Sequence, residues 1–171
     1  PALREAVWAA AVPHWFDAAM LAALLDKPLE ETEALVAELA RLSFVEPFPG
    51  RGYNIHERTR TLLLERLWRE APDRYQELSR NAAEYSSRQD QNETAWRVET
   101  IYHLVVADPK RGVSQLQNTG WEWHNNFTYD KVDAMARAAR EHADGGRLHK
   151  GGVGWTLFWE ALLDVDYSRP R

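Results

Sequence analysis

The sequence predicts a mainly α-helical protein with one small β-hairpin. Apolar residues recur three and four positions apart along most of the 171 residues, which is the spacing of one helix face. Two short segments, 44–48 and 53–55, instead carry the apolar and aromatic residues typical of strands, and a Pro-Gly-Arg-Gly turn at 49–52 joins them. Hydrophobic residues make up 44% of the chain and charged residues 27%, which favours a globular fold over a disordered or fibrous one.

Residues 1–71 are expected to form a first domain. Asp17 can cap a helix, and Pro28 suits the first turn of the next one. Three helices, a two-stranded hairpin and a fourth helix follow one another, and we expect them at 2–11, 17–25, 29–42, 44–48, 53–55 and 57–71. Three helices followed by a two-stranded hairpin is the element order of a winged helix.

Residues 72–171 are expected to form a second, helical domain. Successive helices with their loops occupy roughly 17–20 residues each, which is typical of solenoids built from helix pairs. The apolar stripes indicate antiparallel helix hairpins, as at the start of a tetratricopeptide-like (TPR-like) or other α-solenoid. The final helix is expected to place Trp155, Phe158, Trp159 and Leu162 on one face. A glycine-rich link at 145–154 precedes it, and the segment 150–154 is expected to be a flexible hinge.

Composition excludes several classes of protein. The chain has no cysteine, so disulfide frameworks, thiol nucleophiles and cysteine-ligated metal sites are ruled out. No apolar run approaches the ~20 residues that cross a bilayer, and no secretory signal opens the chain. We therefore expect a cytoplasmic protein without membrane partners. The start at Pro1 suggests a piece of a longer protein.

The charge pattern bears on DNA binding, which the winged-helix order suggests. The helix expected at 29–42 would have to enter the major groove, yet it carries four glutamates against one arginine. Its acidic face would repel phosphates, where basic side chains normally supply most of the affinity. We expect protein contacts rather than nucleic acid. The alternative is a winged-helix DNA-binding transcriptional regulator with a helical ligand-binding or dimerisation domain.

No set of residues predicts an enzyme or a metal site. His56-Glu57 opens the zinc-protease pattern H-E-x-x-H, but Arg60 occupies the position of the second ligand. The lysine of the segment 150–154 precedes the glycines, so a phosphate-binding loop is also absent. His103 follows Glu99 by four residues, and we expect a structural contact worth a few tenths of a kcal/mol. The remaining interpretation of His56 is a cap at the junction of strand and helix.

The chain contains eight tryptophans, and most of them lie on the apolar stripes, where packing is the usual role of an aromatic ring. Trp15 precedes the second helix, and Trp121 lies off the stripe of its own helix. We expect these two side chains to be exposed anchors for a protein partner.

Residues 2–70 resemble the winged-helix domain of STAND NTPases, a class that includes NB-ARC proteins of apoptosis, plant immunity and bacterial signalling. The resemblance rests on four segments, 3–7, 16–25, 32–39 and 42–46, and on Ile55-His56-Glu57 ahead of a leucine-rich helix. In that family a Met-His-Asp motif follows the hairpin, and its histidine senses the nucleotide phosphates. The resemblance implies this role for His56. The segment 99–109, within residues 73–143, is similar to the helical region that follows in bacterial multidomain relatives.

The resemblance implies a regulatory module without its own catalysis. Its partner would be a nucleotide-binding domain ahead of Pro1 in the same chain, and ATP or ADP would belong to that domain. No cofactor is expected within these 171 residues. The winged helix would pack on the ADP-bound core and rotate away on exchange, and the helical domain would relay nucleotide state or sense a partner.

Overall fold

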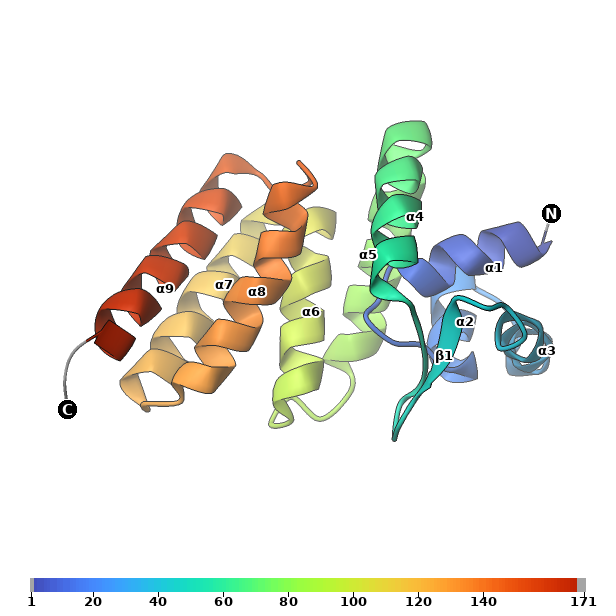
Figure 1. The fold of residues 1–171 in the computed structure, drawn as a ribbon, viewed down its shortest axis with the longest axis horizontal. Coiled ribbons are helices and arrows are strands. Elements are labelled where there is room, and N and C mark those ends of the chain that lie inside the picture. The colour runs from blue at the N-terminus through green and yellow to red at the C-terminus, as the bar shows by residue number, and fades with distance from the viewer. Residues whose placement is uncertain (1, 169–171) are drawn as a thin grey trace. The chain divides into compact units, whose positions relative to one another are not determined.

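The computed structural model describes residues 2–168. It forms two compact units, which we call unit 1 (up to Tyr85) and unit 2 (from Ser86). Over the described residues the fold is mainly helical with one two-stranded antiparallel sheet, as the sequence predicts (Figure 1).

Unit 1 begins with three helices, then the hairpin, then two further helices. They are α1 (Ala2–Ala11), α2 (Ala18–Leu25), α3 (Leu29–Leu39), β1 (Val45–Phe48), β2 (Gly52–Ile55), α4 (Glu57–Glu70) and α5 (Pro72–Ser87). The Asp17 carboxylate caps α2 by accepting a hydrogen bond of 2.7 Å from the Met20 N–H. The buried Thr32 hydroxyl donates to the Ala18 carbonyl over 2.9 Å and so ties α3 to the first turn of α2. α3 ends at Leu39, and residues 40–42 continue as turns.

The hairpin is anchored to the segment that precedes α2. Val45 pairs with Ile55 and Phe48 with Gly52, and Tyr53 exchanges two backbone hydrogen bonds with Phe16 at 2.7 and 2.9 Å. Gly52 has a φ of 90°, and a Cβ there would lie 2.5 Å from the Phe16 carbonyl oxygen. Only glycine fits this close approach.

α5 packs on unit 1, so the unit boundary lies near its end rather than at 71/72 as the sequence suggests. Tyr75 is fully buried and meets Trp68 edge to face, with ring centroids 5.5 Å apart. Asn81 donates a hydrogen bond of 3.2 Å to the Leu24 carbonyl of α2. Pro72 begins α5 without separating it from α4, because the buried side of α5 completes the core of unit 1.

Unit 2 consists of two helix hairpins. They are formed by α6 (Thr94–Ala107) with α7 (Pro109–Asn125), and by α8 (Tyr129–Asp144) with α9 (Lys150–Ser168). α6 also packs on α8, and α7 on α9, so equivalent helices of the two hairpins lie together (Figure 1).

Two glycines of α7 allow this close stacking. A Cβ on Gly112 would lie 2.4 Å from the Val105 backbone nitrogen of α6. A Cβ on Gly120 would lie 2.2 Å from the Trp159 indole of α9. Polar contacts add to the packing, because Arg97 of α6 pairs with Glu122 of α7. The Arg97 hydrogen bond lowers the pKa of the Glu122 carboxyl.

The prediction of a flexible hinge at 150–154 is wrong. α9 begins at Lys150, so Gly151, Gly152 and Gly154 are helical. A Cβ on Gly152 would come within 2.7 Å of Leu148 Cγ, and the Thr156 hydroxyl donates to the Gly152 carbonyl over 2.9 Å. Close packing thus keeps this segment helical, although each glycine disfavours a helix by about 1 kcal/mol relative to alanine.

Candidate interaction surfaces

His56 lies between β2 and α4, with its backbone held from both sides. Its N–H donates to the Phe44 carbonyl over 2.8 Å, and its own carbonyl accepts from the Arg60 N–H over 2.9 Å. The residue takes the N-cap position of α4, but its side chain makes no capping hydrogen bond. The prediction that the His56 side chain caps α4 is therefore wrong. The imidazole is exposed and can meet a ligand or a neighbouring domain.

Arg60, which replaces the second histidine of the zinc-protease pattern, is buried and has a structural role. Its Nε donates to the carbonyls of Ala11 and Pro13 at 3.0 and 3.2 Å, and Nη2 donates to the Val12 carbonyl at 3.2 Å. The guanidinium thus supplies donors to carbonyls at the carboxyl end of α1, where a helix lacks partners and favours a cation. Across residues 2–168, no group of three or more histidine, aspartate and glutamate side chains could hold a metal ion.

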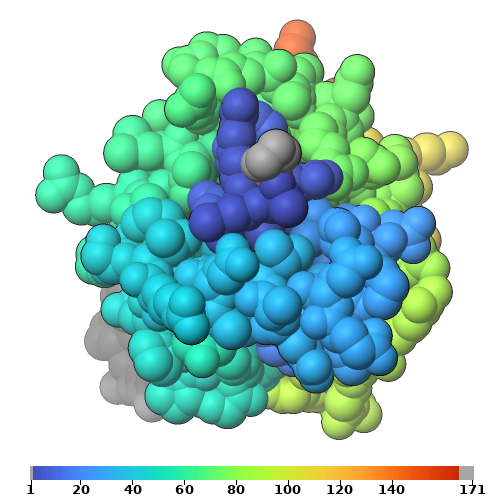
Figure 2. All heavy atoms as spheres, turned by 90° about the vertical axis from the view of Figure 1, so that its right-hand side faces the viewer, coloured from blue at the N-terminus to red at the C-terminus, as the bar shows by residue number. Residues whose placement is uncertain are grey.

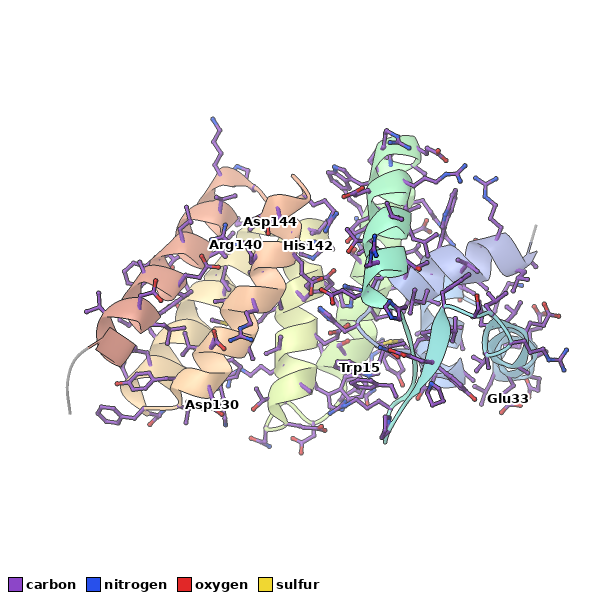
Figure 3. The ribbon with its side chains drawn as sticks, in the orientation of Figure 1. Trp15, Glu33, Asp130, Arg140, His142 and Asp144 are labelled. Carbon is purple, nitrogen blue, oxygen red and sulfur yellow. The ribbon has the colours of Figure 1, made fainter. Side chains whose placement is uncertain are left out.

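The acidic side chains of α3 face solvent. All four of its glutamates are exposed, and Glu33 is labelled in Figure 3. They are Glu30, Glu31, Glu33 and Glu38. Figure 2 looks onto this side of unit 1, where the light-blue residues of α3 form part of the surface. Lys27 lies 2.7 Å from Glu31, so this lysine is paired with an acid of this surface.

The expectation that Trp15 is exposed is wrong. Its side chain is only 8% exposed. The indole stacks on Phe48 of β1 with ring planes 9° apart, and the Arg51 guanidinium lies 4.5 Å above its centroid. Figure 3 labels Trp15 beside the β1–β2 hairpin. Trp15 therefore packs within unit 1.

Trp121, in contrast, is exposed to 37%. Its indole lies 5.5 Å from the Phe158 ring and 5.0 Å from Trp159, both on α9. Trp155 joins the same cluster, 5.2 Å from Phe158. An open hollow of about 270 Å³ lies beside these rings and is lined by Gly151, Gly154, Trp155 and Phe158.

The sequence interpretation missed how α9 divides these aromatic side chains. Trp159 is fully buried against α7, whereas Phe158 is 37% exposed, so the rings do not share one face. The signal was present in the spacing: Gly152, Thr156, Trp159 and Leu163 form one stripe, and Trp155, Phe158 and Leu162 belong to another.

The interior of unit 2 contains a cluster of polar side chains. His103 Nε2 lies 3.0 Å from a Glu99 carboxylate oxygen, and both side chains are almost fully buried. This confirms the expected contact, but burial removes the water that would screen it on a helix surface. His142 of α8 stacks on Tyr102 of α6, with centroids 3.9 Å apart.

The hydrogen bonds of His142 specify a neutral ring. Nε2 lies 2.9 Å from the Tyr102 carbonyl oxygen and must donate to it. Nδ1 accepts from the Arg147 Nε at 3.2 Å, so it cannot also carry a proton. Burial, and then the charges of Arg147 and His103, hold the pKa of His142 well below 6.5, against a smaller opposing effect of Glu141. Figure 3 labels His142 on α8.

We expect unit 2 to lose stability in mild acid because of His142. The unfolded chain binds a proton near the ordinary pKa of about 6.5, whereas the folded chain does not until a much lower pH. The free energy of unfolding therefore has its full value above about pH 6.5. It falls as the pH drops below about 6.5, by up to about 1.4 kcal/mol per pH unit for one group. Urea unfolding of the chain between about pH 7 and pH 5 measures this slope.

The control for this prediction is His142→Phe, which keeps a ring against Tyr102. The variant is expected to be less stable at neutral pH, because the Tyr102 carbonyl and Arg147 each lose one hydrogen bond. The slope of its unfolding free energy against pH should be smaller, by about the contribution of one histidine. An unchanged slope would show that other groups control the acid response.

Among the helices of residues 2–168, none has the length and the apolar character needed to span a bilayer.

Comparisons with protein-family models, with curated proteins and with solved structures find no match to this chain.

Proposed function

We propose that this chain is a non-catalytic regulatory and protein-interaction module of a larger STAND-type signalling NTPase that acts in the cytoplasm. In this proposal unit 1 is a winged helix, with the β1–β2 hairpin as its wing. Unit 2 is the beginning of a TPR-like or other α-solenoid. The nucleotide-binding domain would precede Pro1 in the same chain and would carry the ATP or ADP.

The exposed imidazole of His56 is the observation that carries the proposal. It stands at the junction of β2 and α4, where the STAND pattern places its phosphate-sensing histidine. The backbone is fixed on both sides, by the 2.8 Å bond to Phe44 and the 2.9 Å bond from Arg60. Because the backbone is held on both sides, the ring has a defined position. A hydrogen bond from the ring to a charged phosphate would be stronger than one to a neutral group, so the ring can report whether the phosphate is present.

The surface charge of α3 supports a protein partner over DNA. Its four glutamates are exposed along the helix that would enter the major groove. Binding there would bring carboxylates toward phosphates, without basic side chains to neutralise the phosphates and release their counterions.

The stacked hairpins of unit 2 support a role in relay or partner sensing. Each helix packs on its hairpin partner and on the equivalent helix of the other hairpin, so a displacement of one hairpin repacks the other. Nucleotide exchange would release unit 1 from the nucleotide-binding domain, and unit 2 would follow the change of state.

The test is His56→Ala in the protein with its nucleotide-binding domain attached. We expect ADP affinity to fall about tenfold, the effect of losing one hydrogen bond to a charged group. His149→Ala is the matched control, because His149 is also exposed but lies in unit 2, and it should bind ADP as the unmodified protein does. Isothermal titration calorimetry measures both. Unchanged ADP affinity in His56→Ala, or a sequence ahead of Pro1 without a phosphate-binding loop, would overturn the proposal.

A further inference from the structure

α9 carries a second apolar stripe, on a side that is not used to pack unit 2. Buried residues Gly152, Thr156, Trp159 and Leu163 face α7 and α8. The outer stripe consists of six residues at helical spacing, namely Gly151, Gly154, Trp155, Phe158, Leu162 and Val165. A helix at the surface of a single folded unit needs only one apolar face, so the outer stripe requires a separate explanation.

The outer stripe is accessible to a partner. Phe158 is 37% exposed and Val165 is 50% exposed, while Gly151 and Gly154 are exposed as well. Trp155 and Leu162 are half-buried. Trp121 of α7 lies against Phe158 and extends the apolar surface to one side.

Side-chain size changes along the stripe in one direction. The amino-terminal half has the two glycines and the hollow of about 270 Å³ beside them. A Cβ added to Gly154 would meet nothing within 4 Å, so the space above this glycine is open. The carboxyl-terminal half instead carries the projecting side chains of Leu162 and Val165.

We propose that α9 pairs in antiparallel orientation with α9 of a second copy of this chain. With Phe158 opposite Phe158 at the two-fold axis, the helical rise places Gly151 opposite Val165 of the second copy. Gly154 then lies opposite Leu162 of the second copy. Each small residue thus meets a large one, and the hollow of each copy receives an aliphatic side chain of the other. Parallel pairing would instead oppose glycine to glycine and leave the hollows unfilled.

This inference goes beyond the proposed function, because self-association through α9 requires no nucleotide and no STAND relationship. Sedimentation equilibrium of the chain at increasing concentration tests it. We expect a monomer–dimer equilibrium. Phe158→Glu should raise the dimer dissociation constant about 30-fold or more, as for a central hot spot. Val165→Glu should also weaken the dimer, because its carboxylate would face the apolar hollow.

Leu157→Glu is the matched control. Leu157 lies next to Phe158 and is 50% exposed, but it is outside the outer stripe. The same charge placed there should leave the dimer intact, and circular dichroism should show that all three variants keep their helices. A chain that is monomeric at all accessible concentrations overturns the proposal, and so does a dimer that Phe158→Glu leaves unchanged.

Cysteine cross-linking tests the orientation, because the natural chain contains no cysteine. Phe158→Cys should form a disulfide-linked dimer under mild oxidation, since two-fold pairing places position 158 against itself. Leu157→Cys should cross-link far less. Equal cross-linking at both positions would contradict the antiparallel register. Neither result depends on ADP binding, so self-association and the nucleotide-sensing proposal can fail separately.

Discussion

Arg60→Met is expected to lower the free energy of unfolding of unit 1 by about 3 kcal/mol or more. The methionine fills a similar volume but removes the donors to three carbonyls, those of Ala11, Val12 and Pro13. Arg60 is 8% exposed, so little water can replace these donors. Each unsatisfied buried acceptor costs about 1–3 kcal/mol. The cation at the carboxyl end of α1 is lost as well.

Hydrogen exchange of the whole chain measures this effect, because it reports α1 and α4 separately from unit 2. Arg60→Met should lose protection in α1 and α4. Arg60→Lys should lose part of it, since one ammonium keeps the charge but lacks the spread of the guanidinium donors. Arg58→Met, at an exposed position of the same helix, should change stability by less than about 0.5 kcal/mol. Equal effects at positions 58 and 60 would refute the anchoring role.

Breaking the buried pair in α6 is expected to cost nearly as much in unit 2. Glu99 and His103 are 1% and 0% exposed, with 3.0 Å between the interacting atoms. Glu99→Leu leaves His103 buried without this carboxylate, and His103→Leu leaves the carboxylate buried without the ring. We expect each change to lower the free energy of unfolding by about 3 kcal/mol, the usual effect of truncating one member of a buried pair.

The double variant Glu99→Leu/His103→Leu should be more stable than either single variant. With both polar groups replaced by apolar ones, no isolated buried group remains, and such replacements are often close to neutral. Urea unfolding of the four proteins gives the coupling energy of the pair. Additive losses in the double variant would show that the two side chains act separately.

The exposed pair Arg66 and Glu70 provides the comparison for this cycle. These residues have the same spacing of four, and their atoms lie 2.9 Å apart, but both side chains are more than one third exposed. Arg66→Leu should cost only a few tenths of a kcal/mol. The contrast separates the effect of burial from that of the spacing alone.

Local sequence signals predicted the order of the elements in the described chain. Asp17 begins α2 because its carboxylate accepts the Met20 N–H, a contact that depends only on neighbours three residues apart. Pro109 begins α7 directly after the capping residue Asp108, for the same kind of local reason. The spacing of Glu99 and His103 likewise predicted their contact, because residues four apart share a helix face.

The candidate site residues were harder to place, because exposure depends on what packs over a side chain. Trp15 and Trp121 both lie off a clear helical stripe. The β1–β2 hairpin covers Trp15 within unit 1, whereas Trp121 in unit 2 is 37% exposed. For His56 the pattern predicted the position between strand and helix, but not that its ring would leave the helix uncapped.

Signals that act within a few residues thus specified the elements. Helix spacing and capping specified the helices, and the strand residues with their turn specified the hairpin. Contacts between residues far apart in the sequence set the rest. The Arg60 guanidinium reaches the end of α1, and Trp159 occupies the space that Gly120 leaves free. α9 turns Trp159 inward against Gly120 of α7 and leaves Phe158 37% exposed. The spacing within α9 places the two rings on different stripes, and the contact with Gly120 of α7 decides which stripe is buried.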